Sequence, residues 1–262
     1  MKTGDLLEIK DVSKFFHGSA GAKYHVLEKI NLSIEKPTNV GILAGIISPL
    51  DSGKSTLMKI ISAIEKPSSG EVLIEEKIYD KPDGRVIYIP EKPSSFPWMN
   101  VKQNIEFAIH VSKNLVEKEK IKIDEIISVV GLTGYEDHFP HEKSLGFRLR
   151  ISIARALAAG AKIVLLDDPF KNLHGETKNE IIRLIKSLRE NYNRVLLFST
   201  SNINEAVSIS DRIYLLSHRP GRIIKEIEID CTKRDEQSEY IASVKNDIEK
   251  LFQNHDKIPS FA

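Results

Sequence analysis

The sequence has little of several features that mark specialised proteins. Among its 262 residues Cys231 is the single cysteine, so no disulfide can form within the chain, which suits a reducing compartment. Glycine and proline occur 14 and 11 times, an ordinary usage that excludes collagen-like and low-complexity chains. Neither sign of charge dominates, because 38 basic residues face 37 acidic ones and leave a formal net charge of +1. The chain as a whole therefore lacks the field that attracts nucleic acid, and we expect no nucleic-acid partner.

Long apolar runs are missing too. The longest uncharged stretch, residues 37–50, contains two prolines and falls short of the roughly 20 residues that span a bilayer. Asp5 and Glu8 interrupt the start of the chain, which predicts no secretory leader. We therefore expect a cytoplasmic protein that does not insert into a membrane. Hydrophobic residues at 41% and charged residues at 29% predict that the chain folds as a globular protein.

The hydrophobic pattern predicts an alternation of strands and helices. Predicted strands cover residues 6–16, 24–35, 39–47, 71–79, 86–89, 163–166, 195–198 and 213–216. Predicted helices cover residues 55–63, 101–111, 117–130, 147–159, 176–190 and 237–252. A strand-rich start, a block of helices in the middle and a return to alternation indicate an α/β protein.

The strongest site signal is the segment Gly-Lys-Ser-Thr at residues 53–56, which follows a buried strand and opens a helix. Backbone N–H groups and the helix dipole favour an anion at such a turn. Lys54 is expected to reach the β and γ phosphates of a nucleotide, and the Ser55 hydroxyl is expected to ligate Mg²⁺. A second signal is Asp167 followed by Asp168, where a strand end would place a carboxylate near that metal. Alone, this pair is equally typical of a simple exit from a strand.

Together with further segments, these signals resemble the ATP-binding subunits of ABC transporters. The resemblance extends from about Leu7 to Ile229, and its matching segments are 97–105, 153–157, 165–170, 204–207, 211–213 and 219–223. Segments 97–98 and 219–223 look most like importer subunits for nitrate, sulfonate and taurine-type substrates. The resemblance implies a P-loop NTPase fold of the ABC ATPase type, in which a RecA-like core carries an N-terminal antiparallel β subdomain. It also implies one domain over residues 1–230, with a helical subdomain inserted at about 98–158, and a helical tail over 231–262.

The resemblance also implies partners and cofactors. In this family two ATPase subunits pair head to tail, and each ATP with its Mg²⁺ lies between one chain's phosphate loop and the other chain's signature segment. The implied partners are a second ABC ATPase subunit, in a homodimer or a heterodimer, and transmembrane permease subunits, with the chain peripheral on the inner face of the membrane. The implied nucleotide-binding residues are Phe16, Ser48, Asp51, Ser52, Gly53, Lys54, Ser55, Thr56, Ser144 and Gly146. Phe16 would stack on adenine, although a core aromatic at a strand end is the other interpretation.

The phosphate loop departs from the family pattern at two glycine positions, which hold Ser48 and Asp51. A carboxylate about 4 Å from a phosphate charge costs roughly 4 kcal/mol at an effective dielectric constant of 20. Aspartate tolerates left-handed backbone angles, so the loop can still form. The signature is altered as well, because residues 143–147 keep Ser144 and Gly146 but place Leu145 where backbone should meet the partner's γ-phosphate.

The implied catalytic positions also differ. Glu91 replaces a glutamine that senses the γ-phosphate through Mg²⁺ and water; it could still ligate the metal, along with Ser55 and Asp167, but adds a charge. Asp168 replaces the glutamate that activates the attacking water, and its shorter arm can cost about 100-fold in rate. Ser201 replaces the switch histidine and cannot be a cationic donor. His174 stands where an aspartate closes the loop that couples the two sites.

These substitutions spare Lys54, Ser55 and Asp167, so the sequence predicts an ATP-binding importer subunit with weak or no ATP hydrolysis that couples ATP binding to a permease. Hydrolytic and signature positions are altered on the same chain, so pairing with an ordinary subunit would leave neither composite site complete. The alternative, motivated by Asp51 and Leu145, is a catalytically inactive structural or regulatory subunit that holds another ATPase or a membrane complex. A soluble P-loop ATPase acting on DNA or ribosomes is disfavoured by the near-neutral charge and by the importer-like segment 219–222.

Overall fold

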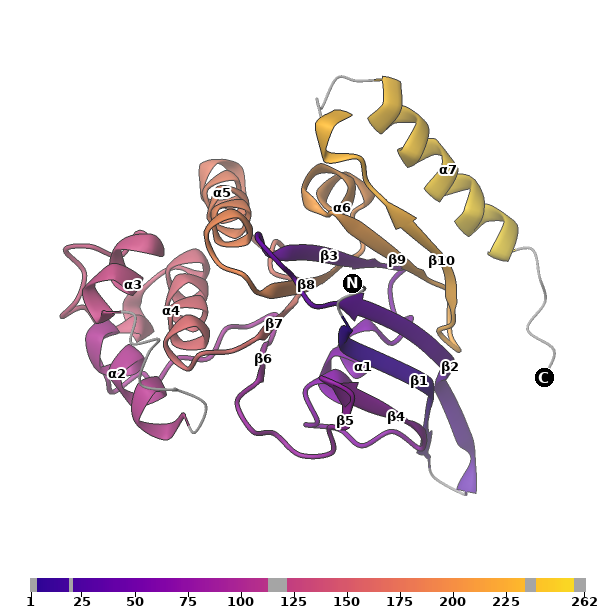
Figure 1. Cartoon of the computed structure of the whole chain (residues 1–262), viewed down its shortest axis with the longest axis horizontal. Helices are drawn as coiled ribbons and strands as arrows, with labels where there is room; N and C mark the ends of the chain where they lie inside the picture. The colour runs from indigo at the N-terminus through magenta and orange to yellow at the C-terminus, as the bar shows by residue number, and fades with distance from the viewer. Residues whose placement is uncertain (1–3, 19–20, 113–121, 234–238, 257–262) are drawn as a thin grey trace.

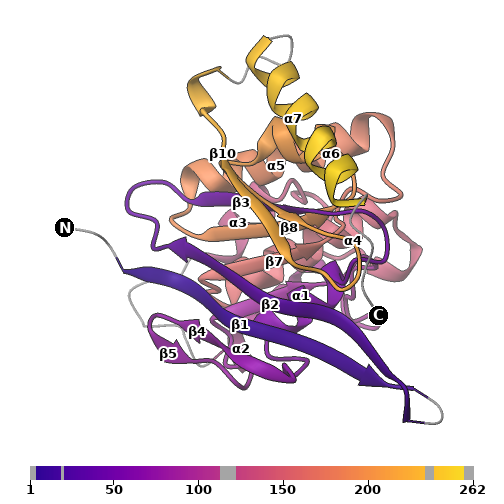
Figure 2. The same cartoon turned by 90° about the vertical axis from the view of Figure 1, so that its right-hand side faces the viewer.

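The computed structural model describes residues 4–18, 21–112, 122–233 and 239–256 (Figure 1). The strands form two sheets. The smaller sheet is antiparallel, in the order β2-β1-β4-β5. Its strands are β1 (Asp5–His17), β2 (Lys23–Glu35), β4 (Ser69–Ile74) and β5 (Lys77–Ile78). Figure 2 shows the long β1–β2 hairpin running beneath the second sheet.

The larger sheet has the order β10-β9-β3-β8-β7-β6, and all of its strands are parallel except β10, which pairs antiparallel with β9. The strands are β3 (Ile42–Ile47), β6 (Val86–Ile89), β7 (Ile163–Asp167), β8 (Val195–Thr200), β9 (Arg212–Leu216) and β10 (Ile223–Glu228). Every residue of β7 and β8 is buried, as the continuous apolar runs predict for strands covered on both faces. In such a sheet, ligands bind beyond the carboxyl ends of the parallel strands.

Helices cover both faces of the larger sheet. They are α1 (Lys54–Ile61), α2 (Val101–Val111), α3 (Ile123–Val129), α4 (Leu145–Ala158), α5 (Gly175–Asn191), α6 (Ile203–Ile209) and α7 (Glu239–Asp256). One hydrophobic core lies between the sheet and helices α2 to α6, and a second lies among the smaller sheet, α1 and the opposite face of the larger sheet. Helices α2, α3 and α4 gather at one end of the molecule (Figure 1). None of the helices in the described ranges is both long and apolar enough to cross a bilayer.

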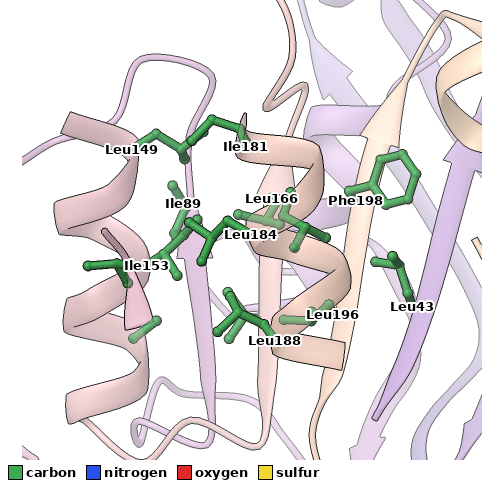
Figure 3. Packing of buried hydrophobic residues seen from close by; sticks show 14 of the residues in the cluster. Leu43, Ile89, Leu149, Ile153, Leu166, Ile181, Leu184, Leu188, Leu196 and Phe198 are labelled. Carbon is green, nitrogen blue, oxygen red and sulfur yellow. The ribbon is translucent and has the colours of Figure 1, made fainter. Parts of the chain in front are cut away.

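Helix α5 illustrates how the pattern of the sequence builds the first core. Ile181, Leu184, Ile185 and Leu188 recur at helical spacing, and all four are buried. Figure 3 shows this face of α5 packed against buried side chains of strands β6, β7 and β8. This packing therefore holds the carboxyl ends of β6, β7 and β8 in a fixed position relative to α5.

Some predicted elements were wrong in their limits. The single strand expected at 71–79 is two antiparallel strands, because the chain turns at Glu75 and Glu76, both with positive φ. The helix expected at 117–130 begins at Ile123, after an extended Lys122, while 117–121 lie outside the described residues. Strand β10 and helix α6 were not predicted, because β10 is a partly exposed edge strand rich in charge and α6 is only seven residues long.

Candidate functional site

The loop 48–53 joins β3 to α1 at the carboxyl end of the parallel strands. Asp51 and Gly53 adopt left-handed φ angles of 60° and 98°. A Cβ on Gly53 would lie 2.9 Å from Val26 Cγ1 and 3.0 Å from Leu27 Cδ2, so only glycine fits there without displacing the β2 side chains. Gly53 is also the N-cap of α1 and caps it with no side chain, which leaves the first N–H groups of the helix available to an anion.

Lys54 begins α1 and is 8% exposed. Its ammonium donates hydrogen bonds to the Ser48 carbonyl (3.1 Å), the Ser48 hydroxyl (2.9 Å) and the Pro49 carbonyl (3.1 Å). The Ser48 hydroxyl is also hydrogen-bonded to the Ser52 hydroxyl. Burial lowers the pKa of Lys54, and the negative charges of Asp168, Asp167 and Asp51 oppose that shift. Oxygens of the loop therefore bind the Lys54 ammonium. The carboxylates of Asp167 and Asp168, at the end of β7, are close enough to affect its pKa.

Asp167 is the last residue of β7 and is 5% exposed. Its Oδ2 accepts a hydrogen bond of 2.8 Å from the Tyr88 hydroxyl, and its Oδ1 accepts one of 2.7 Å from the Ser199 hydroxyl. Burial, and then the neighbouring charge of Asp167, raises the pKa of the Tyr88 phenol, which stays protonated at neutral pH and acts as a donor. Both oxygens of the Asp167 carboxylate are therefore held by hydroxyls from the strands on either side.

Asp168 follows at the exit from β7 with a left-handed φ of 49°. Its N–H donates to the Ser199 hydroxyl at 3.0 Å. Burial raises the pKa of the Asp168 carboxyl, while the positive charges of Lys54 and Lys171 lower it. Aspartate tolerates this backbone region better than most residues do. The backbone conformation therefore explains why residue 168 is an aspartate and not the longer glutamate.

Glu91 lies beyond the end of β6 and pairs with Lys171. The Lys171 ammonium lies 3.0 Å from Glu91 Oε2, and the two side chains are 48% and 34% exposed. The hydrogen bond to Glu91 raises the pKa of Lys171. The charge that Glu91 adds is thus offset by a basic side chain 80 positions further along the chain.

Ser201 lies directly after β8 and is exposed. In the sheet register Asp167 pairs with Ser199, so Ser201 stands two residues beyond the strand partner of Asp167. The structure therefore brings Ser201 to the same sheet edge as Asp167 and Asp168, although it supplies a neutral hydroxyl in place of an imidazole.

The residues around Ser201 form a separate, partly buried network. The Thr200 hydroxyl donates to Glu205 Oε2 at 2.5 Å, and Lys178 donates to Glu205 Oε1 at 2.5 Å. The Asn202 side chain caps α6 by accepting from the Asn204 and Glu205 N–H groups. These contacts fix the backbone on either side of Ser201.

The predicted signature residues lie at the start of α4, within the three helices α2, α3 and α4 that we call the three-helix group. Ser144 is the N-cap of α4 and accepts a hydrogen bond of 3.3 Å from the Phe147 N–H. A Cβ on Gly146 would come within 2.6 Å of Thr177 Cγ2 on α5, which explains glycine there by packing alone. Leu145 is partly buried against the first core. Helix α4 and helix α1 pack in different parts of the molecule, so these residues and the phosphate loop are separate surfaces of one chain (Figure 1).

Phe16 lies near the end of β1 and is 40% exposed. The Lys14 ammonium lies 4.8 Å from the centroid of its ring. The ring is thus not a core residue, which removes the structural alternative raised by the sequence.

The oxygen ligands at this sheet edge suit Mg²⁺. Ser55, in the first turn of α1, and Asp167 are the hard oxygen donors that Mg²⁺ prefers. The described residues contain no group of three or more His, Cys, Asp or Glu that could hold a metal by themselves. A metal here would therefore need further oxygens from a bound ligand. Mg²⁺ fits this requirement, because proteins usually hold it with one or two of their own groups together with substrate phosphates.

Tyr88, Ser199 and Lys171 are the contacts that the sequence did not reveal. Tyr88 lies on β6 opposite Leu165, and Ser199 lies on β8 opposite Asp167. The available signal was a hydroxyl residue near the carboxyl end of each buried strand, but its use requires the strand order β8-β7-β6. Lys171 carried no signal apart from its position three residues after Asp168.

Comparison with known proteins identifies the family to which the chain belongs. The sequence model of the ABC transporter family matches residues 27–171, and the chain belongs to that family. The resemblance drawn from the sequence is thereby confirmed. The aliphatic sulfonates import ATP-binding protein SsuB of Bacillus cereus is 35% identical over 222 residues, which cover 85% of each chain. The nitrate import ATP-binding protein NrtD of Synechocystis is 32% identical over 231 residues, covering 88% of this chain and 85% of that protein.

The fold comparison agrees. A dimeric post-hydrolysis state of the ATP-binding cassette MJ0796, bound to ADP and Pi, superposes with a TM-score of 0.71 and 26% identity. The match covers 86% of this chain and 99% of that one. The predicted ABC ATPase fold is confirmed.

Proposed function

We propose that the chain is the ATP-binding subunit of an importer-type ABC transporter, which binds Mg-ATP, hydrolyses it weakly or not at all, and couples binding to a membrane permease. The observation that carries this proposal is the survival of Lys54 and Asp167 at the carboxyl edge of the parallel sheet, next to a helix N-terminus without a side-chain cap. The names of the relatives, import ATP-binding proteins for sulfonates and nitrate, support the direction of transport.

In this proposal the phosphate loop holds the nucleotide. Lys54 would exchange its hydrogen bonds to Ser48 and Pro49 for hydrogen bonds to phosphate oxygens, and the N–H groups at the start of α1 would bind the β-phosphate. Ser55 and Asp167 supply the oxygens for Mg²⁺, which screens the phosphate charges when bound. Ser52 and Gly53 belong to the same loop, in which Ser48 and Asp51 replace glycines, and Thr56 lies in the first turn of α1. Phe16 would receive the base.

Weak hydrolysis follows from the residues around the expected γ-phosphate. Asp168 is short for a group that must reach an attacking water, and Ser201 offers no cation to the developing charge. Leu145 puts a side chain between Ser144 and Gly146, where the family presents backbone to the partner's nucleotide. Because two chains of the proposed dimer share each site, these changes act on both sites at once.

The proposal also includes the domain limits expected from the sequence: one ABC domain over residues 1–230, a helical subdomain inserted at about 98–158, and a tail over 231–262. The proposed permease contact lies beside the three-helix group. Trp98 is 68% exposed, and its ring lies 5.5 Å from that of Phe96, which also packs against Phe107 at 4.9 Å. Next to them is a cavity of about 600 Å³, bounded by β6, α2 and α4. Exposed aromatic clusters of this kind mark protein-binding surfaces. The chain would thus be held at the inner face of the membrane by its partner.

The test is import by the purified complex of this chain with the membrane chain that copurifies with it, using an aliphatic sulfonate and nitrate as substrates. Lys54→Ala should abolish import while the complex still forms. Lys59→Ala, an exposed lysine in the last turn of α1, is the matched control and should import normally. Normal import by Lys54→Ala, with loss only when the chain is removed, would instead establish a structural subunit.

A further inference from the structure

The carboxylate proposed to face the metal is held on both sides by hydroxyls from neighbouring strands. Asp167 ends β7, the Tyr88 hydroxyl reaches its Oδ2 from β6, and the Ser199 hydroxyl reaches its Oδ1 from β8. The distances are 2.8 Å and 2.7 Å, and the Asp167 side chain is almost completely buried. Such a two-sided arrangement leaves the carboxylate a single orientation.

The two hydroxyls differ in how they are held. The Ser199 hydroxyl also accepts from the Asp168 N–H at 3.0 Å, so its own proton is directed at Asp167. The Tyr88 hydroxyl is carried by a half-buried ring that packs against the second core and also lines the cavity between β6, α2 and α4. Each carboxylate oxygen has two lone pairs, so accepting one hydrogen bond leaves both oxygens able to bind a water or a metal.

From this geometry we infer that Tyr88 is a positioning residue for the metal of the nucleotide. Its hydroxyl fixes the rotation of the Asp167 carboxylate and stabilises the ionised form by hydrogen bonding, as outer partners of metal ligands generally do. The inference rests on the proposed binding of Mg-ATP, and it assigns a role to a residue that the phosphate-loop and signature patterns do not include. Ser199 performs the same task from the opposite strand.

Tyr88→Phe is the direct test, since it removes the hydroxyl and keeps the ring that packs in the core. The affinity for ATP is measured by calorimetry in Mg²⁺ and again in EDTA, and the ratio of the two affinities is the readout. The ratio should fall about 10-fold in the variant, because loss of an outer partner typically costs about 10- to 100-fold in metal affinity. Affinity in EDTA should not change, since the hydroxyl does not contact the nucleotide in this account.

The matched control is Tyr79→Phe, at a tyrosine more deeply buried than Tyr88, whose hydroxyl accepts from the Asp83 N–H and lies outside the Asp167 contacts. Its ratio should equal that of the natural chain. Ser199→Ala is a second variant, expected to lower the ratio as Tyr88→Phe does, should the latter not fold.

Three outcomes would overturn the inference. An unchanged ratio in a folded Tyr88→Phe chain, or in Ser199→Ala where Tyr88→Phe does not fold, contradicts it and leaves the proposed function standing. An equal loss of affinity with and without Mg²⁺ shows that the hydroxyls support the fold and not the metal. No binding of ATP by the natural chain in either solution overturns the proposed function itself, and this inference with it.

Discussion

The proposed nucleotide site has two regions that differ in burial and in how closely they follow the family pattern. We call the first the floor, formed by Lys54, Tyr88, Asp167 and Ser199 at the ends of the parallel strands; apart from the half-buried Tyr88, these residues are at most 8% exposed. We call the second the rim, formed by the more exposed Glu91, Lys171 and Ser201. The floor keeps the lysine and the aspartate that the family uses, whereas Glu91 and Ser201 on the rim replace its glutamine and histidine.

The difference has a physical basis in hydrogen bonding. Removing one member of the floor leaves a buried partner without its hydrogen bond, at a cost of about 1–3 kcal/mol or more for a charged group. A rim residue can change at little cost, because water replaces the lost contact. Folding alone therefore disfavours change in the floor, and its survival does not prove that the site turns over ATP. The state of the site has to be decided by measurements that separate binding from hydrolysis.

The largest expected effect comes from rebuilding the hydrolytic residues. Asp168→Glu combined with Ser201→His should raise ATP turnover about 100-fold, because the longer carboxylate reaches the water and the imidazole supplies a donor. Glutamate must adopt the left-handed backbone of Asp168, so the variant should also be less stable by about 1 kcal/mol. Phosphate release by the complex and a urea denaturation curve measure the two effects.

The control for this pair is Asp168→Glu combined with Ser201→Ala, which lengthens the carboxylate without the donor and should gain less. A rebuilt variant that binds ATP but shows no gain would contradict the assignment of the defect to the hydrolytic residues. Leu145 in the signature would then be the residue that limits turnover.

A smaller effect is expected at Asp51, which is exposed and has a left-handed φ of 60°. Asp51→Gly removes a negative charge beside the phosphates and should tighten Mg-ATP binding about 10-fold, equivalent to about 1.4 kcal/mol. Asp51→Asn separates the two causes, since asparagine tolerates the same backbone angle but carries no charge. Equal affinity in Asp51→Asn and Asp51→Gly assigns the effect to charge, and unchanged affinity in both would show that the Asp51 carboxylate points away from the nucleotide.

The smallest effect is expected from Glu91→Gln, which separates Glu91 from Lys171. The pKa of Lys171 is raised by Glu91 and should fall toward the ordinary lysine value, which an NMR titration of the side chain would follow. A raised lysine pKa means that the pair stabilises the fold below the ordinary lysine pKa, and that this contribution is lost as pH rises through the raised value. The natural chain should therefore be slightly more stable than the variant at neutral pH but not at strongly alkaline pH. The same Lys171 pKa in the natural chain and in Glu91→Gln would falsify the pairing.

Much of the floor could be predicted from sequence order alone. The buried strand, the glycine turn and the helix around Lys54 are contiguous, and Asp167 ends an unmistakable apolar run. The pairs Tyr88–Asp167 and Glu91–Lys171 could not be predicted, because their members are 79 and 80 positions apart. Their contact depends on the pairing of β6 with β7, and nothing in the spacing of the residues encodes that pairing.

The secondary-structure errors have a similar cause. The turn at Glu75 and Glu76 uses left-handed angles on residues that have no strong preference for them, so the pattern predicted an unbroken strand. The edge strand β10 is supported by its antiparallel pairing with β9 more than by an apolar face of its own. In both places tertiary contacts outweigh local preference.

The central claim is that the retained floor still binds Mg-ATP despite the altered rim and Asp51. Calorimetric titration of Mg-ATP into the natural chain, with Lys54→Ala alongside, tests it most directly. The account predicts saturable binding near one nucleotide per chain with micromolar affinity, about 8 kcal/mol, and a loss of at least about 100-fold in Lys54→Ala. Binding by the natural chain that is no tighter than that of Lys54→Ala would contradict the claim and indicate a subunit that holds its partners without using ATP.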